Sequence, residues 1–121
     1  MPDDRFPVTW SGRAAVVAVP VELDLTIADG LREALLGALN AGALGLVVDM
    51  TTTTFCDSAG ISAITRAVRR AAAHDATMRL AVSSPAVLRV LGLVGIDRLI
   101  DVYPDASAAL ASLPDHAKNL S

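Results

Sequence analysis

Aromatic residues are scarce in this chain of 121 residues, although 53% of its residues are apolar. The only aromatic side chains are those of Trp10, Tyr103, Phe6 and Phe55. The core must therefore be built from alanine, valine, leucine and isoleucine. The length is enough for one domain and too short for two ordinary ones.

Few residues are available for metal, redox or nucleotide chemistry. Cys56 is the only cysteine, so the chain cannot form an internal disulfide. Lys118 is the only lysine and follows no glycine-rich loop, which excludes a P-loop nucleotide site. The two histidines, His74 and His116, belong to no cluster with metal-ligand spacing. We therefore expect neither a metal nor a cofactor.

Charge and hydropathy exclude two further classes. The formal net charge is −3, so the chain lacks the basic footprint of a nucleic-acid-binding domain. The longest uncharged run, 34–48, contains asparagine and glycine and is shorter than the roughly 18 apolar residues of a spanning helix. The first residues are acidic and do not resemble a secretory signal. We expect a soluble cytoplasmic protein that binds no nucleic acid or membrane directly.

Apolar periodicity predicts strands that alternate with helices. The expected strands are 14–23, 44–50, 77–84 and 97–103, and 6–12 is expected to add an antiparallel edge strand. The expected helices are 26–42, 58–74, one that begins at residue 85, and 104–113. Thr26 and Asp29 have capping-box spacing, while Ser84 and Asp105 precede the third and fourth helices as caps.

This alternation predicts a single α/β domain with a mixed, mostly parallel sheet of about five strands and about four helices. We expect the domain to span residues 5–113. The ends, 1–4 and 114–121, have the composition of flexible polar tails.

The stretch 47–60 runs from a buried strand through a polar loop to a helix start. Function in such sheets gathers beyond the carboxyl ends of the strands. Asp57 or Ser58 is suited to cap the helix, and we expect one to cap it while the other presents its side chain. An anion on Ser58 would meet N–H groups of Ala59 and Gly60, and Gly60 keeps side-chain bulk away.

A nucleophilic serine needs a base, and the sequence provides none nearby. His74 lies roughly 24 Å from Ser58 along the same predicted helix, and His116 lies in a predicted tail. There is no G-x-S-x-G elbow, so hydrolase chemistry is disfavoured. Cys56 beside a strand end has the position of a buried apolar residue.

Two other features have two interpretations each. The threonines 51–54 provide a second phosphate acceptor or simply a polar loop. Arg66, Arg69 and Arg70 form a partner surface or a solvated helix face.

The combination of these residues resembles the STAS family, and within it the bacterial anti-sigma-factor antagonists. The central motif is matched by Asp49, Thr51, Phe55, Asp57, Ser58, Ala59 and Gly60, and an upstream motif by Glu22, Leu23 and Asp24. The segment 87–110 is similar to the C-terminal part of the family, so the resemblance covers about residues 8–113. Thr53, Cys56 and Ala59 depart mildly from the family pattern.

The resemblance implies a binding protein rather than an enzyme. In this family the unphosphorylated form binds an anti-sigma factor, often a serine kinase, and so releases a sigma factor, commonly in a stress response. The kinase switches the antagonist off by phosphorylating the motif serine, and a phosphatase resets it. ATP and magnesium belong to the kinase. By position, Ser58 is the acceptor, and the implied partner-binding residues are Asp24, Asp57, Ser58, Ala59, Gly60 and Ser62.

A STAS module that does not switch is the alternative implied by the same resemblance. Such a module would be a scaffold subunit of a stress-signalling or lipid-transport complex. The presence of Ser58 and Asp57 favours the switching antagonist.

Overall fold

Strand β4 (Gly45–Met50), an almost continuous apolar stretch, lies at the centre of the sheet. The structure is a computed structural model that describes residues 5–118. Both faces of β4 are buried, because Leu46 and Val48 belong to one hydrophobic cluster and Val47 belongs to another. This burial confirms the strand predicted from its lack of polar alternation.

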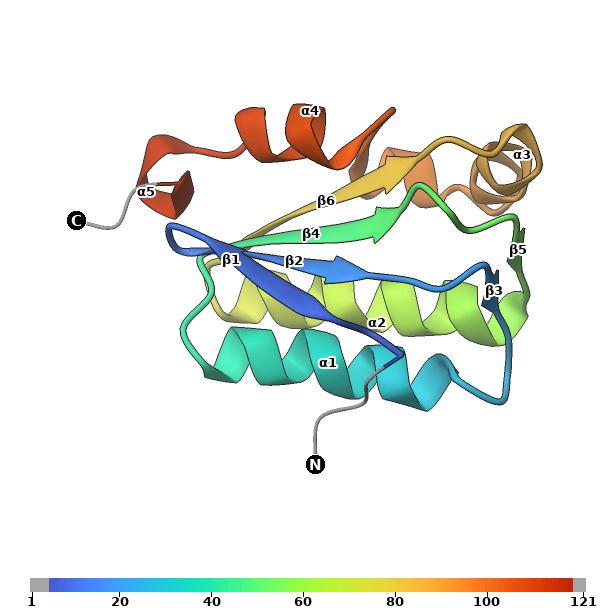
Figure 1. The fold of residues 1–121 in the computed structure, drawn as a ribbon, viewed down its shortest axis with the longest axis horizontal. Coiled ribbons are helices and arrows are strands. Elements are labelled where there is room, and N and C mark those ends of the chain that lie inside the picture. Colours follow the sequence, from blue (N-terminus) through green and yellow to red (C-terminus); the bar gives the residue numbers. More distant parts are fainter. Residues whose placement is uncertain (1–4, 119–121) are drawn as a thin grey trace.

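Five strands form one mixed sheet in the order β1-β2-β4-β6-β7 (Figure 1). All neighbours pair in parallel except the edge strand β1, which is antiparallel to β2 as expected. The other strands of this sheet are β1 (Val8–Ser11), β2 (Ala14–Ala18), β6 (Thr77–Val82) and β7 (Asp101–Tyr103). A second, two-stranded parallel sheet consists of β3 (Glu22–Leu23) and β5 (Phe55–Cys56).

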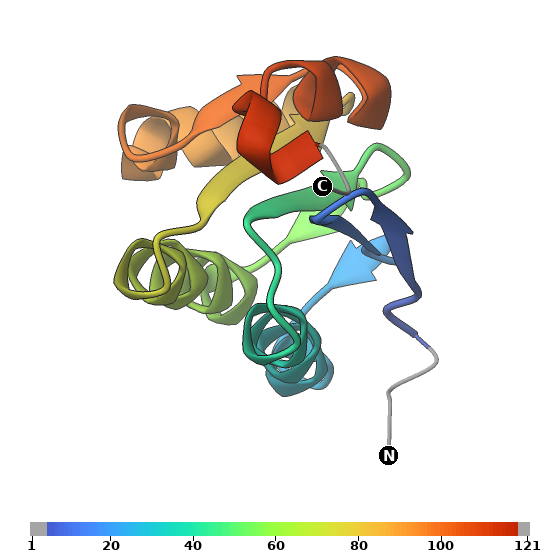
Figure 2. The ribbon, with the colours of Figure 1, turned by 90° about the vertical axis from the view of Figure 1, so that its left-hand side faces the viewer.

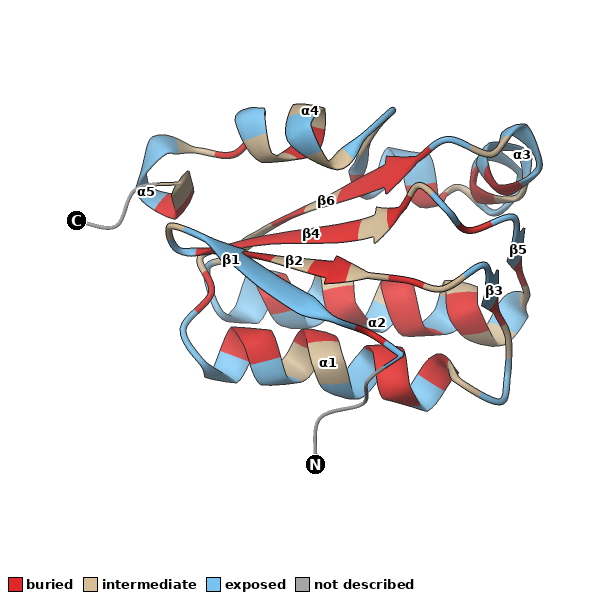
Figure 3. Cartoon of the chain, viewed as in Figure 1, coloured by how far each residue is buried: buried red, intermediate tan, exposed pale blue. Residues whose placement is uncertain are grey.

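Helices cover both faces of the larger sheet (Figures 1 and 2). Helices α1 (Ala28–Asn40) and α2 (Ser58–Ala73) lie side by side on one face, and α4 (Ala106–Ala111) and α5 (Asp115–Lys118) lie on the other. Helix α3 (Pro85–Val94) and the 3-10 helix η1 (Ile96–Arg98) complete the fold. Figure 3 shows that buried residues of α1 and α2 face the sheet. None of the helices in residues 5–118 has the length and apolar character needed to cross a bilayer.

Three predicted helix starts are confirmed, and a fourth is wrong. Asp57, Ser84 and Asp105 each cap their helix by accepting a backbone N–H bond with the side chain. The predicted capping box of Thr26 and Asp29 does not form, since α1 begins at Ala28 with no side-chain cap. The Thr26 hydroxyl bonds the Asp24 carboxylate instead, and this local turn competes successfully with the capping box.

The strand predicted over 14–23 is interrupted. It divides into β2 and β3 because Pro20 cannot donate a ladder hydrogen bond. The freed carbonyls of Val19 and Pro20 accept bonds from the Thr53 hydroxyl, at 3.4 and 2.8 Å. The interruption lets β3 leave the main sheet and pair with β5 instead of β4.

The C-terminal part also differs from the prediction. The strand expected over 97–103 is confined to β7, because η1 occupies its first residues. A tail was expected from Pro114, but residues 115–118 form α5 and Ala117 is completely buried. The lack of a side chain on Gly45 leaves the space that Leu113 and Ala117 fill. Residues 1–4 and 119–121 lie outside the described part of the chain.

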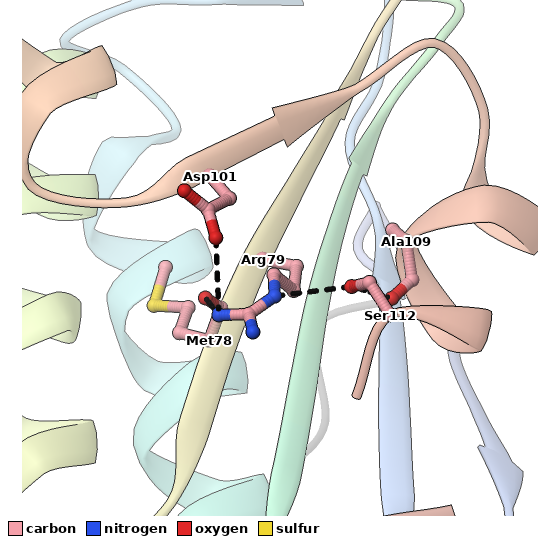
Figure 4. A network of polar contacts seen from close by, with 5 residues as sticks. All are labelled: Met78, Arg79, Asp101, Ala109 and Ser112. Carbon is pink, nitrogen blue, oxygen red and sulfur yellow. Dashed lines mark hydrogen bonds and ion pairs between the residues drawn. The ribbon is translucent and has the colours of Figure 1, made fainter. Parts of the chain in front are cut away.

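A polar network attaches α4 to the sheet (Figure 4). Arg79 of β6 donates from Nε to the Ser112 hydroxyl at 3.0 Å, and its Nη1 lies 3.9 Å from the Asp101 carboxylate. Ser112 in turn donates to the carbonyl of Ala109 at 2.7 Å. The guanidinium therefore links β6, β7 and the end of α4 in one half-buried contact.

Gly60 allows the first turn of α2 to approach β3 and β5 closely. A Cβ at this position would lie 2.8 Å from Leu23 Cγ and 2.9 Å from Cys56 Sγ. These distances are shorter than ordinary van der Waals contacts, so a larger residue would push α2 away from both strands.

We predict opposite effects of alanine at two helical glycines. Gly60→Ala should lower the free energy of unfolding by about 1–3 kcal/mol through overpacking. Gly37→Ala is the matched control, since its Cβ would meet nothing within 4 Å. It should raise the free energy of unfolding by about 0.5–1 kcal/mol through better helix propensity. Urea titrations followed by circular dichroism measure both, and equal stability of the two variants would contradict the close approach at Gly60.

Candidate functional site

Two short parallel strands bring two carboxylates to one edge of the molecule. In the β3–β5 pair, Glu22 lies opposite Phe55 and Leu23 lies opposite Cys56. The next residues in this register are Asp24 and Asp57, so the pairing places the two aspartates predicted from the sequence beside each other. In Figure 1 this pair of strands lies at the end of the sheet where α1 and α2 begin.

The Asp57 carboxylate accepts three backbone hydrogen bonds. Its Oδ1 accepts from the N–H groups of Ala59 and Gly60, at 3.0 and 3.1 Å, and so caps α2. Its Oδ2 accepts from the N–H of Leu25 at 3.0 Å, across a sequence separation of 32 residues. Asp57 therefore connects the start of α2 to the turn that precedes α1.

Asp24 organises that turn. Its Oδ1 accepts from the Thr26 hydroxyl and also from the Thr26 N–H at 3.0 Å. Its backbone carbonyl accepts from the N–H groups of Ile27 and Ala28, at 3.1 and 3.0 Å. The bond from the Thr26 hydroxyl lowers the pKa of Asp24 below its ordinary value, so this carboxylate is ionised at neutral pH.

Ser58 is the first residue of α2 and is exposed. Within residues 5–118, no group forms a hydrogen bond with its hydroxyl. The expectation that the N–H groups of Ala59 and Gly60 would meet an anion on Ser58 concerns the modified protein and stays a prediction. In the unmodified structure, Asp57 already accepts from both groups. Ser58 thus presents a free hydroxyl beside an anionic cap.

Exposed apolar side chains surround this acidic spot. Val21, Leu25 and Phe55 have exposed fractions of 55%, 76% and 51%. The carbonyl of Val21 accepts from the N–H of Phe55 at 3.3 Å, and the N–H of Leu25 is held by Asp57. Sequence reasoning missed Val21 and Leu25 as surface residues, because apolar residues next to a strand resemble core. We call Val21, Asp24, Leu25, Phe55, Asp57 and Ser58 the acidic-apolar face.

The other predicted site residues have different environments. Gly60 is buried against Leu23 and Cys56, so it shapes the site without being accessible. Ala59 is half-buried and packs on the main core. Ser62 is exposed and lies one helical turn after Ser58, on the same side of α2.

The threonine loop acts as a structural connection. Thr51 donates its hydroxyl to the Asp49 carboxylate at 2.7 Å, and Thr52 donates to the carbonyl of Val19 at 3.3 Å. Thr53 is fully buried and donates to the carbonyls of Val19 and Pro20. Because these three hydroxyls are engaged, the polar-loop interpretation explains the run better than a second phosphate acceptor does.

Among residues 5–118, no histidine lies near Ser58 to act as a base for nucleophilic catalysis. His74 follows the far end of α2, and His116 lies on α5 on the opposite face of the sheet. Both oxygens of Asp57 are engaged by backbone donors. Residues 5–118 contain no group of His, Cys, Asp and Glu that could hold a metal ion.

Substitutions at Asp57 should separate its two structural roles. Asp57→Ala removes both the cap and the bond to Leu25, and should cost about 2 kcal/mol of unfolding free energy. Asp57→Asn keeps one carbonyl oxygen for the cap and should cost about 1 kcal/mol. Ser58→Ala should change stability by less than about 0.5 kcal/mol. Denaturant melts compare the three variants, and a larger loss from Ser58→Ala than from Asp57→Ala would contradict these assignments.

Cys56 should react slowly with alkylating reagents in the folded protein. Its side chain is 7% exposed, and burial together with the nearby Asp57 charge raises its pKa from 9.0 to about 11. The thiolate at pH 8 should then be about 100-fold scarcer than in the unfolded chain. Iodoacetamide labelling in buffer and in urea, followed by mass spectrometry, measures the difference.

The same pKa shift makes a prediction about stability at alkaline pH. Folding favours the protonated thiol of Cys56. The contribution of this thiol to the free energy of unfolding is therefore complete below about pH 9 and is lost as pH rises toward about 11. A Cys56→Ala variant should lack this part of the pH dependence. Rapid labelling of the native protein would show that Cys56 is accessible after all.

Comparison with solved structures identifies the fold. An anti-sigma factor antagonist from Mycobacterium paratuberculosis superposes with a TM-score of 0.83, at 24% identity over 91% of this chain and 93% of that chain. A STAS domain protein from Planctomyces limnophilus superposes with a TM-score of 0.79, at 21% identity over 90% of this chain and 97% of that chain. The phosphorylated form of the Bacillus cell fate determinant SpoIIAA superposes with a TM-score of 0.67, at 18% identity over 85% of this chain and 95% of that chain.

The sequence itself provides the family assignment. No curated protein matches the chain. The family model described as the STAS domain, however, matches residues 6–109, which is most of the chain and includes every element of the acidic-apolar face. This protein therefore belongs to the STAS domain family.

Proposed function

We propose that this protein is an anti-sigma-factor antagonist whose unphosphorylated form binds an anti-sigma factor through the acidic-apolar face. The observation that carries the proposal is the free, exposed hydroxyl of Ser58 on that face, next to Asp57. Solved neighbours described as anti-sigma factor antagonists support it, and one of these, SpoIIAA, is known in both an unphosphorylated and a phosphorylated form. The activity is binding rather than catalysis, and it belongs in the cytoplasm with the transcription machinery.

The apolar side chains provide the binding energy in this proposal. Leu25, Phe55 and Val21 are more than half exposed, and burying what remains exposed of each beneath a partner contributes roughly 1–2 kcal/mol. The Asp57 bond to Leu25 and the Asp24 turn hold Leu25 in one position. A preorganised apolar anchor loses less conformational entropy on binding than a mobile one.

Phosphorylation of Ser58 would switch this face off. A phosphoryl group adds about −1.5 to −2 charges near neutral pH. It would lie beside the carboxylates of Asp57 and Asp24, and the N–H groups that could neutralise it already bond Asp57. The added charge would therefore remain on the surface and oppose a docked partner, while the fold stays unchanged. A serine kinase, most simply the anti-sigma factor itself, and a phosphatase complete the cycle.

We predict that Ser58 is the only residue that an anti-sigma kinase modifies. Incubation with candidate anti-sigma kinases and magnesium-ATP, followed by intact-mass measurement and phosphopeptide mapping, tests this prediction. One phosphoryl group should appear on Ser58 and disappear in Ser58→Ala. Thr52→Ala and Thr54→Ala are the matched controls, since both threonines are exposed in the same loop. Label retained by the Ser58→Ala variant would contradict the assignment.

The binding step has its own test. Calorimetric titration of the anti-sigma factor should give at least tenfold weaker binding to genuinely Ser58-phosphorylated protein than to unmodified protein. Ser58→Ala should keep its affinity and become insensitive to ATP. Leu25→Ala should weaken binding without changing the circular dichroism spectrum. Equal affinity of the phosphorylated and unmodified forms would favour the alternative, a STAS scaffold that does not switch.

A further inference from the structure

A groove between α1 and α2 carries four arginines, on a protein whose net charge is −3. Arg32 lines it from α1, and Arg66, Arg69 and Arg70 line it from α2. These four residues are a large share of the 10 cationic residues of the chain. Figures 1 and 2 show the two helices side by side on the face of the sheet opposite α4 and α5.

The groove consists of two stretches that join at Arg32 and Arg66. The stretch farther from Ser58 has a volume of about 320 Å³, and leucine and alanine side chains line it between the arginines. The nearer stretch has a volume of about 270 Å³ and reaches Leu25 and Ser62. From Ser62 to Arg70 the groove extends along about two turns of α2, or roughly 12 Å.

The arginines are available for a partner. Arg66, Arg69 and Arg70 are exposed, and no carboxylate among residues 5–118 lies within ion-pair distance of them. Arg32 pairs with Asp29 at 3.6 Å, but both side chains are exposed, at 46% and 90%. Exposed pairs of this kind are weak, so a better placed carboxylate would displace Asp29. The helix pair thus carries unbalanced positive charge along this groove, beside the half-buried Leu36.

We propose that this arginine groove binds an acidic amphipathic helix of a partner protein. An apolar side chain of that helix would pack on the half-buried Leu36 and on the methylene stems of the arginines, and flanking carboxylates would pair with the guanidinium groups. A nucleic-acid partner fits less well, because no aromatic side chain lines either stretch for base stacking and the whole chain is acidic. The proposal does not depend on phosphorylation of Ser58.

A designed peptide tests the proposal directly. The probe is a fluorescein-labelled helical peptide with leucines at i, i+4, i+7 and i+11 and glutamates on both flanks. Its fluorescence anisotropy should rise saturably with the full-length protein, and the binding should weaken as ionic strength rises. A peptide with glutamine in place of glutamate, and a scrambled peptide of the same composition, should each bind at least tenfold more weakly.

Charge-reversal variants locate the binding site. R66E/R69E should bind the acidic peptide at least tenfold more weakly than the wild type. The matched control R89E/R98E, which replaces exposed arginines on α3 and η1, should keep its affinity for the peptide within twofold. Ser58→Ala should bind like the wild type, which separates this result from the test of the antagonist function. Circular dichroism confirms that each variant is folded.

Four results would overturn the proposal. The first is absence of saturable binding to the acidic peptide, and the second is that the scrambled peptide binds as tightly as the acidic peptide. The third is an equal loss of peptide affinity in the two double variants. The fourth is that a duplex DNA binds through Arg66 and Arg69 more tightly than the acidic peptide does. The last result would identify the groove as a nucleic-acid surface. Chemical-shift changes confined to α1 and α2 would support the assigned site independently.

Discussion

The carboxylate of Asp57 holds together the surface on which the proposed function depends. One side chain caps α2 through Ala59 and Gly60 and fixes the turn before α1 through Leu25. The two segments are far apart in the sequence and belong to different strand-helix connections. Without this common acceptor, the turn that contains Leu25 would have only its local bonds to Asp24 and no polar link to the start of α2. The bonding also explains why Asp57, rather than Ser58, is the structural residue of the motif.

The environment of Ser58 suits a switch that acts on the surface. Its neighbours in the threonine loop use their hydroxyls to connect the loop to Val19 and Pro20, and Thr53 is fully buried. The Ser58 hydroxyl forms no hydrogen bond in the described structure, so phosphorylation of Ser58 would break no internal hydrogen bond. The Asp57 cap already occupies the N–H groups of Ala59 and Gly60. The negative charge of a phosphoryl group would therefore act mainly on a bound partner.

This molecule carries two adjoining surfaces of opposite charge. The acidic-apolar face lies where α1 and α2 begin, and the arginine groove runs from there along the same two helices. Leu25 and Ser62 lie at the junction. A partner that contacted both surfaces would be oriented by complementary charge as well as by apolar contact. Two partners of opposite charge could equally use them in turn.

The sequence by itself determined the α/β alternation, the buried central strand and the starts of three helices, because apolar period and short polar caps act locally. Its motifs also singled out Asp24, Asp57 and Ser58, whereas the pairing of β3 with β5 that brings the two aspartates together belongs to the tertiary structure. Only the tertiary structure decided that Pro20 would divide a strand, that Thr26 would bond Asp24, and that Ala117 would be buried over Gly45. It alone decided which donors Asp57 occupies and that Leu25 is exposed. These outcomes depend on strand register and on contacts between distant segments, which compete with local preferences and override them.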